Sequence, residues 1–220
     1  MNLFDIVGPV MVGPSSSHTA GAAKIGNVAH RLLNEEVAEA VILFHGSFLA
    51  TGKGHGTDKA LLAGLMGLAV DDPLIPYSFE IAQQKGLKYR FDGIDLGDAH
   101  PNSVKLLLTG VSGKKLELTA SSIGGGRIEV NEVDGLANSF SGDYPTLIIQ
   151  NQDQPGLVAE ITCVLAGFQI NIATMQLYRS SRGGYAVTVI ECDNEVPQDV
   201  VAELAQEEGI VKVTYLGLTN

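Results

Sequence analysis

The chain contains little cysteine, with only Cys163 and Cys192 among its 220 residues. Both lie within apolar patterns, which favours buried free thiols over a disulfide. Because an iron–sulfur cluster takes about four cysteine ligands, two thiols are too few to hold one. The five histidines form neither an H-x-x-x-H pair nor a cysteine–histidine knuckle, so we expect no metal ion held by this chain.

Basic residues are also scarce, with 14 lysines and arginines against 25 acidic residues and a formal net charge of −11. Proteins that bind nucleic acid usually carry a basic patch, so the composition argues against that class. No apolar run approaches the roughly 18 residues of a membrane helix, and no charged-then-apolar leader follows Met1. We expect a soluble, cytoplasmic protein that holds any anionic ligand by a local device.

The 45% hydrophobic content allows one large or two modest domains. In the first part, apolar residues at helical spacing alternate with strand-like runs. Helices are predicted at about 18–33, 59–68 and 78–85. A strand is predicted within 37–50, which contains the apolar run 40–44, and further strands are predicted at about 88–91, 103–109, 115–121 and 127–130.

Residues 134–145 are rich in turn formers and carry no periodicity, so we place a domain boundary between residues 143 and 144. Beyond it, strands are predicted at 146–151, 170–178, 185–192 and 210–216, with helices near 157–168 and 197–206. This β-α-β-β-α-β order is the ferredoxin-like unit. The sequence predicts an α+β protein, with a mixed α/β domain over 1–143 and a ferredoxin-like domain over 144–220.

The run Gly13-Pro14-Ser15-Ser16-Ser17-His18-Thr19 stands where the first predicted helix begins. Serine and threonine side chains accept from the free N–H groups of a first turn, and those N–H groups also attract carboxylates. His18 would then lie beside an anion with a pKa suited to proton transfer. Three consecutive serines exceed what one cap needs, so we interpret the run as a ligand site. The alternative is a serine-rich cap beside a surface histidine.

The glycine-rich segment 52–58 does not match a phosphate-binding loop. Five residues instead of four separate its first glycine from Gly46, and Gly54 stands where that motif has serine or threonine. We interpret the segment as a flexible turn whose backbone can approach a ligand closely. Lys53 and His55 are secondary candidates that we expect to be solvated.

Two further segments combine polar side chains with turn formers. Asp98-Ala99-His100-Pro101-Asn102 is most simply a turn held by its proline. In Ser121-Ser122-Ile123-Gly124-Gly125-Gly126-Arg127, successive N–H groups could bind an anion beside the arginine; a tight hairpin is the plain alternative. Together with the Ser-His run, these segments suggest parts of one polar cleft.

These motifs together resemble the beta subunits of bacterial iron–sulfur L-serine dehydratases, on the residues 13–19, His100-Pro101-Asn102 and Ser122-Ile123-Gly124-Gly125-Gly126. The resemblance spans nearly the whole chain. It implies one subunit of an enzyme that converts L-serine to pyruvate and ammonia without pyridoxal phosphate. In that family a [4Fe–4S] cluster is held by cysteines of the alpha subunit. The first domain is also similar to the allosteric substrate-binding domain of some phosphoglycerate dehydrogenases.

The resemblance implies β-elimination of water from L-serine, with a cluster iron acting as Lewis acid on the hydroxyl. Ser16, Ser17 and Thr19 would face the substrate carboxylate or the surroundings of the cluster. His18 would transfer protons, and His100 and Asn102 are lesser candidates for the catalytic site.

The second half resembles an ACT domain, an amino-acid-sensing module, on Asn151-Gln152-Asp153-Gln154-Pro155-Gly156-Leu157 and Asn171. In serine-sensing relatives, polar side chains at these places hold the effector across a domain–domain contact. The resemblance therefore implies effector binding by Asn151, Asp153 and Asn171 and a homodimer formed through this domain. Some relatives carry histidine and asparagine in the turn, which leaves the identity of the effector open.

Two other functions compete with a catalytic subunit. One is a purely regulatory, amino-acid-sensing subunit, which the ACT resemblance supports and the Ser-Ser-Ser-His run opposes. The other is a regulatory fragment of a dehydrogenase, although the chain has no nucleotide-binding fingerprint.

Overall fold

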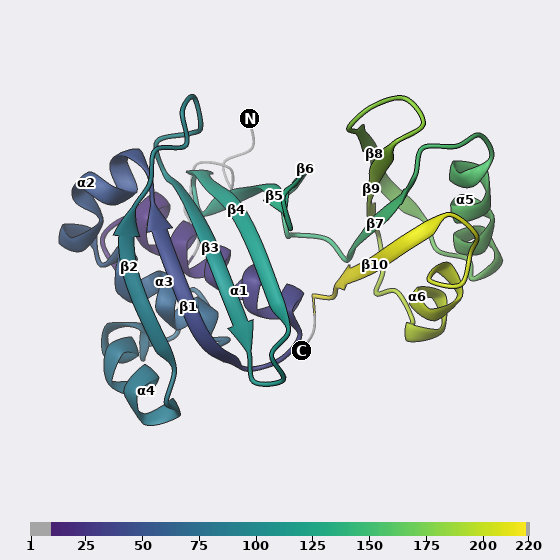
Figure 1. The fold of residues 1–220 in the computed structure, drawn as a ribbon. Coiled ribbons are helices and arrows are strands. Elements are labelled where there is room, and N and C mark those ends of the chain that lie inside the picture. Colours follow the sequence, from purple (N-terminus) through teal and green to yellow (C-terminus); the bar gives the residue numbers. More distant parts are fainter. Residues whose placement is uncertain (1–9, 219–220) are drawn as a thin grey trace. The chain divides into compact units, whose positions relative to one another are not determined.

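The computed structural model describes residues 10–218, and the chain divides into two compact units between Gly135 and Leu136. Each unit contains both strands and helices (Figure 1). The boundary predicted from composition lies between residues 143 and 144, nearer to the second sheet. Among residues 10–218, no helix is both long enough and apolar enough to cross a bilayer.

The first unit is a mixed sheet with helices. Its helical segments are a π-helical turn η2 (Ser16–Ala20), α1 (Gly21–Leu33), α2 (Gly46–His55), α3 (Thr57–Leu65), the 3₁₀ turn η3 (Ile75–Tyr77) and α4 (Ser78–Lys85). Its strands are β1 (Val37–Phe44), β2 (Lys88–Gly93), β3 (Ser103–Gly110), β4 (Lys115–Gly124) and β5 (Arg127–Val133). Neighbouring strands follow the order β2-β1-β3-β4-β5, parallel between β1 and β2 and antiparallel elsewhere. Every predicted element of this unit outside residues 46–58 is therefore confirmed.

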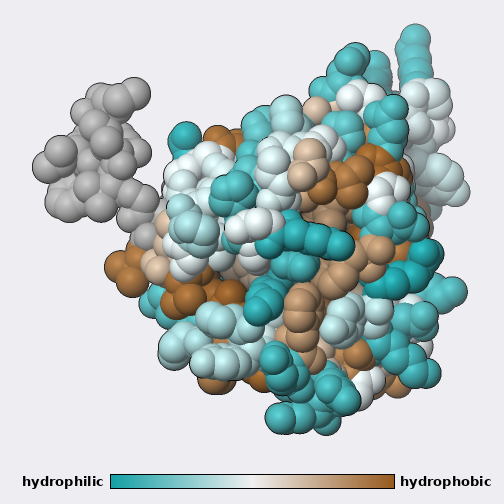
Figure 2. Space-filling view, turned by 90° about the vertical axis from the view of Figure 1, so that its left-hand side faces the viewer, coloured by the Kyte–Doolittle hydropathy of each residue, from teal (hydrophilic) through white to brown (hydrophobic). Residues whose placement is uncertain are grey.

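The core of this unit follows from the alternation of side chains along its strands. Ala40, Ile42 and Phe44 of β1 are buried, while their neighbours in the strand are partly exposed. Helix α1 packs across β4 and β5 and against α3, and it buries the apolar face that its sequence spacing predicts. Figure 2 shows the side formed by α2, α4 and β2, where apolar patches lie between hydrophilic residues.

Two glycines allow α1 and α3 to cross at very short distance. A Cβ atom at Gly64 would lie 2.0 Å from the carbonyl oxygen of Ala23, and one at Gly26 would lie 2.3 Å from that of Leu61. No side chain fits at either position while the helices keep this separation. The small residues that follow the Ser-His run are therefore needed for helix packing.

The structure corrects the prediction for residues 46–58. The segment predicted as the end of a strand and a flexible turn forms helix α2, and only Gly56 turns between α2 and α3. Glycine lowers helix propensity by about 1 kcal/mol, so the glycine content pointed to a turn. Tertiary contacts outweigh this propensity, because Phe48 is buried and the Ser47 and Phe48 amides donate to the carbonyl oxygen of Pro101.

The second unit contains β6 (Leu136–Phe140), β7 (Thr146–Gln152), α5 (Leu157–Gly167), β8 (Ile172–Arg179), β9 (Tyr185–Cys192), α6 (Gln198–Leu204) and β10 (Ile210–Leu216). Its four-stranded sheet has the antiparallel order β10-β7-β9-β8. The β-α-β-β-α-β order from β7 to β10 is confirmed, and with it the α+β class.

Strand β6 corrects the prediction that residues 134–145 carry no periodicity. Asn138 and Phe140 are buried and alternate with more exposed neighbours. The following residue, Ser141, donates from both its amide and its hydroxyl to the buried carboxylate of Glu191 (3.1 Å each). The turn-forming composition of this segment hid a short strand and an anchored connection.

The two cysteines are free thiols, but only one of them is buried. Cys192 lies in the core with Leu147, Ile149 and Ile190, and burial raises its pKa to about 11. Cys163 is exposed, because it lies on the face of α5 that points away from the core. The prediction of two buried thiols is therefore wrong for Cys163.

The helix crossing gives a direct test of the core. We expect Gly64→Ala to lower the free energy of unfolding by about 3 kcal/mol, the upper part of the range for overpacked cores. Gly54→Ala is the matched control, since a Cβ there meets nothing within 4 Å and should leave stability unchanged or raise it by up to about 1 kcal/mol. Urea unfolding followed by circular dichroism measures both, and equal midpoints for the two variants would contradict the packing described.

Candidate functional site

The Ser-His run forms the first helical turn of the chain's described part. Ser15 is its cap: the Ser15 hydroxyl oxygen accepts from the amide of His18 at 3.1 Å. Ser16 and Ser17 are half-buried, and none of the hydrogen bonds among residues 10–218 uses their hydroxyl groups. One serine thus serves the cap, and two hydroxyls remain for another partner.

The imidazole of His18 packs against α2. Its Nε2 atom lies 3.2 Å from Ser47 Oγ and 3.1 Å from Thr51 Oγ1. The ring also contacts Phe48 edge-on and lies 4.9 Å, centroid to centroid, from the ring of His55. His18 is therefore a half-buried residue with defined contacts, and not a solvated surface histidine.

His55 and Thr19 fasten the end of α2 to the first turn. The Thr19 hydroxyl donates to the carbonyl oxygen of His55 at 3.1 Å, and His55 Nδ1 donates to the carbonyl oxygen of Thr51 at 3.1 Å. Thr19 is buried, so its hydroxyl joins two helices in this structure. His55 is half-buried and lies beside His18, and its place as a secondary candidate stays a prediction.

The environment lowers the pKa of His18 below its ordinary value. Burial of the ring is the main cause, repulsion by the neighbouring His55 is the second, and a hydrogen bond with the Ser47 backbone partly offsets both. His18 is therefore a neutral imidazole near pH 7, the form that can accept a proton.

The turn with His100 and Asn102 lies against the start of α2. The carbonyl oxygen of Pro101 accepts from the amide of Ser47 at 2.7 Å. Gly46 has φ +55°, and a Cβ atom there would lie 2.6 Å from this oxygen. A side chain at Gly46 would therefore push the turn away from α2.

Within this turn, the backbone amide of Asn102 donates to His100 Nδ1 at 3.1 Å. His100 is exposed and Asn102 is half-buried. The turn contacts α2 through its backbone. Within residues 10–218, neither the His100 nor the Asn102 side chain is hydrogen bonded to His18. Their catalytic role stays a prediction.

The serine–glycine segment, residues 121–127, contacts the turn that contains His100 and Asn102. The amide of Ser122 donates to the carbonyl oxygen of Asn102 at 2.9 Å. The Ser122 side chain is buried beside Gly21, and its hydroxyl has no hydrogen-bond partner in the described structure. Beyond it, Gly124 pairs with Arg127, and the glycines form the hairpin turn between β4 and β5. This is the tight hairpin predicted from the sequence as the alternative to an anion-binding loop.

A cavity of about 230 Å³ opens beside the first turn and the end of α2. It is below the roughly 300–1,000 Å³ of pockets for drug-sized ligands, so it suits a small one. Its lining residues are Val12, Gly13, Pro14, Thr19, Gly54, His55, Gly56, Lys59, Ile75 and Pro76. His55 and Lys59 supply the titratable side chains of this wall.

The sequence prediction missed two residues that contact His18, namely Ser47 and Thr51. They precede His55 at intervals of four residues, so all three lie on one face of α2. This spacing was visible in the sequence, but it has meaning only if the segment is helical, and the prediction had it as strand and turn.

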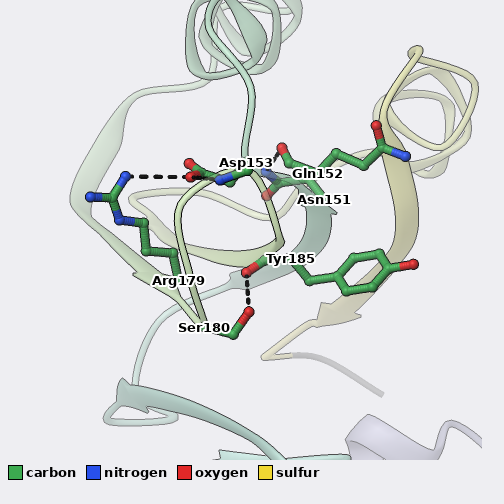
Figure 3. A network of polar contacts seen from close by, with 7 residues as sticks. Asn151, Gln152, Asp153, Arg179, Ser180 and Tyr185 are labelled. Carbon is green, nitrogen blue, oxygen red and sulfur yellow. Dashed lines mark hydrogen bonds and ion pairs between the residues drawn. The ribbon is translucent and has the colours of Figure 1, made fainter.

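The candidate effector residues lie in the second unit, and Figure 3 shows two of them, Asn151 and Asp153. Asn151 is only 3% exposed; its amide nitrogen donates to the carbonyl oxygen of Gln152 at 2.8 Å and its oxygen accepts from Thr188 at 3.2 Å. The Asp153 carboxylate accepts from the amide of Gly183 at 2.9 Å and from Arg179 at 3.3 Å.

Asn171 lies at the other end of the same sheet. Asn151 pairs with Ala186 at the start of β9, whereas Ile172, which follows Asn171, pairs with Cys192 at the end of β9. At about 3.3 Å per residue, this separates the two asparagines by roughly 20 Å. Asn171 is exposed and donates to Asp193 at 2.5 Å. One small ligand cannot touch both asparagines of a single chain.

The residues present do not fit an iron–sulfur cluster. Cys163 is on the surface of α5 and Cys192 is inside the core of the same unit. Within residues 10–218, no three side chains of histidine, cysteine, aspartate or glutamate are grouped so that they could hold a metal ion. The described part of this chain therefore supplies no cluster site.

Comparisons with known proteins agree with this arrangement of two units. The family model of the serine dehydratase beta chain matches residues 2–87, and that of the ACT domain matches residues 146–209. A D-3-phosphoglycerate dehydrogenase of Bacillus subtilis is 27% identical over 90% of this chain and 37% of its own length.

Two relatives match almost from end to end. A probable L-serine dehydratase beta chain of Bacillus subtilis is 41% identical over 98% of this chain and 97% of its own length. The L-serine dehydratase beta chain of Peptoniphilus asaccharolyticus is 37% identical over 97% and 96%. With identity of this extent over both units, the chain belongs to the family of L-serine dehydratase beta chains and carries an ACT domain as its second unit.

Proposed function

We propose that the chain is the beta subunit of an enzyme that, together with an alpha subunit, deaminates L-serine to pyruvate and ammonia. The observation that carries the proposal is the identity of 41% to a beta chain over 98% of this chain. The small number of cysteines supports the same division of roles between the two subunits. With two separated cysteines, the [4Fe–4S] cluster of the enzyme belongs to the alpha subunit.

In this proposal, the first turn and α2 form the part of the active site that this chain supplies. L-serine lies with its carboxylate near the unused hydroxyls of Ser16 and Ser17. His18, kept neutral by burial and by His55, takes the α-proton. The β-hydroxyl leaves as water, and the resulting 2-aminoacrylate hydrolyses to pyruvate and ammonia. His100 and Asn102 line the turn that supports α2, as secondary candidates.

The ACT domain is the regulatory part in this proposal. A small amino acid binds at Asn151 and Asp153 of one chain and at Asn171 of another, because the roughly 20 Å between the two sites on one chain is too long for one ligand. Effector binding therefore goes with a homodimer formed through this unit.

The division of labour predicts that the purified chain is colourless and inactive on L-serine after anaerobic iron–sulfur reconstitution, because it lacks a set of cluster ligands. Adding the alpha subunit should restore pyruvate formation. Iron content, visible absorbance and pyruvate release are measured on the same preparation. Turnover by this polypeptide alone, with purity checked by mass spectrometry, would refute the two-subunit proposal.

The role of His18 predicts a loss of turnover without a loss of folding. In the complex, His18→Ala should lower kcat at least about a hundredfold, the lower range for loss of a general acid or base. Ser17→Ala should chiefly raise KM, since a residue that binds the carboxylate contributes to ground-state binding.

Ser181→Ala, in the exposed loop between β8 and β9, is the control for Ser17→Ala and should change neither constant. Cluster absorbance and Tm are measured on each variant to separate catalysis from folding. If the complex with His18→Ala keeps full activity, the catalytic assignment is wrong and the regulatory alternative gains support.

The shared effector site predicts that Asn171→Ala weakens binding of the effector by removing a polar contact to a small zwitterion. Because Asn171 is exposed, folding should be intact. Gln206→Ala, an exposed amide after α6, is the control. Calorimetry with L-serine and other small amino acids on the full chain measures the affinities, and equal affinity in both variants would move the effector site elsewhere.

A further inference from the structure

The hydroxyl of Thr51 has a single hydrogen, and the structure shows where it points. Thr51 Oγ1 lies 2.9 Å from the carbonyl oxygen of Ser47, one helical turn earlier. A carbonyl oxygen only accepts hydrogen bonds, so the Thr51 hydroxyl donates to it, as threonine often does within helices. The hydroxyl then has only lone pairs left for other partners.

These lone pairs face His18. Thr51 Oγ1 is 3.1 Å from His18 Nε2, and a bare ring nitrogen at that distance would place two lone pairs against each other. A hydrogen on Nε2 turns this contact into a hydrogen bond. Ser47 Oγ, at 3.2 Å, accepts from the same N–H, and its own hydrogen is free to point to Thr51 Oγ1 at 3.4 Å. The network is therefore satisfied with the proton on Nε2.

The other nitrogen of His18 is left open. None of the hydrogen bonds among residues 10–218 uses His18 Nδ1, and the neutral ring carries only one hydrogen. His55 differs, because its Nδ1 donates to the carbonyl oxygen of Thr51 and therefore carries a hydrogen. The hydroxyl of Thr51 thus contacts His18 Nε2, and its carbonyl oxygen contacts His55 Nδ1.

We infer that Thr51 is a positioning residue that holds His18 as its Nε2–H tautomer, so that Nδ1 is the nitrogen that accepts a proton in the reaction. The second part of this inference rests on the proposed function. In the reaction the Cα–H bond breaks, an N–H bond forms at Nδ1, and the electron pair forms the C=C bond as the hydroxyl departs. The same proton, returned to that hydroxyl, completes the leaving water and restores neutral His18.

The tautomer is measured directly by NMR on the full chain with ¹⁵N-labelled histidine, at a pH above the pKa of His18. Long-range ¹H–¹⁵N correlations distinguish the two tautomers, and the His18 signals are those missing from His18→Ala. The wild-type chain and Thr51→Ser should show the Nε2–H form. Thr51→Val, which keeps the shape and loses the hydroxyl, should lose this form or mix it with the other.

Thr162→Val is the matched control for the loss of a hydrogen bond to the helix backbone. Thr162 donates to the carbonyl oxygen of Val158 at 3.0 Å in α5, the same contact that Thr51 makes, without a histidine beside it. This variant should leave the His18 spectrum unchanged. If Thr51→Val does not fold, Thr51→Ala is compared with Thr51→Ser in its place.

The catalytic consequence is measured in the complex with the alpha subunit. Thr51→Val should lower kcat about tenfold with little change in KM, a smaller loss than the hundredfold or more for removal of a general base. Thr51→Ser should restore kcat to near the wild-type value, and Thr162→Val should not change it.

An Nδ1–H form of His18 in the wild-type chain, or the same tautomer in wild type and Thr51→Val, would overturn the inference. Unchanged kcat in Thr51→Val despite an altered tautomer would overturn its catalytic part. The spectra do not depend on activity. A fully active His18→Ala complex would thus refute the catalytic role of His18 in the proposed function, while the NMR spectra would still test the tautomer independently.

Discussion

The site depends on the contact between the first helical turn and α2. Thr19 donates to the carbonyl oxygen of His55 from a buried position, and His18 meets Ser47 and Thr51 one turn away. These bonds bridge segments about thirty residues apart in the chain, so the geometry around His18 exists only when α2 is formed and docked. The tight crossing of α1 on α3 supports this arrangement, because α1 continues from the first turn and α3 follows α2 after a single glycine.

Patterns that depend on local spacing could be predicted from the sequence. The second unit has regular apolar alternation and clear turns, so its β-α-β-β-α-β order followed directly. Helix α2 could not be predicted, because its glycines disfavour a helix locally. What stabilises it is nonlocal: the burial of Phe48 and the bonds from its first amides to Pro101.

The same limit applied to the site. His18 could be singled out because a histidine among hydroxyls at a helix start suits both anion binding and proton transfer. Ser47 and Thr51 went unnoticed, since their common face exists only on a helix. In the second unit, the motif identified Asn151 and Asn171 as a pair, but the strand register places them at opposite ends of β9. Sequence spacing does not reveal such a separation, whereas the register fixes it.

The central claim of this account is that His18, held by α2, faces the substrate in the complex of two subunits. A structure of that complex with a bound, unreactive analogue of L-serine tests it most directly. We predict that the analogue lies beside the first turn, with its reacting carbon within reach of His18 Nδ1 and its carboxylate near Ser16 and Ser17. An analogue bound away from this turn, with His18 Nδ1 open to solvent or bonded to the partner subunit, would contradict the account.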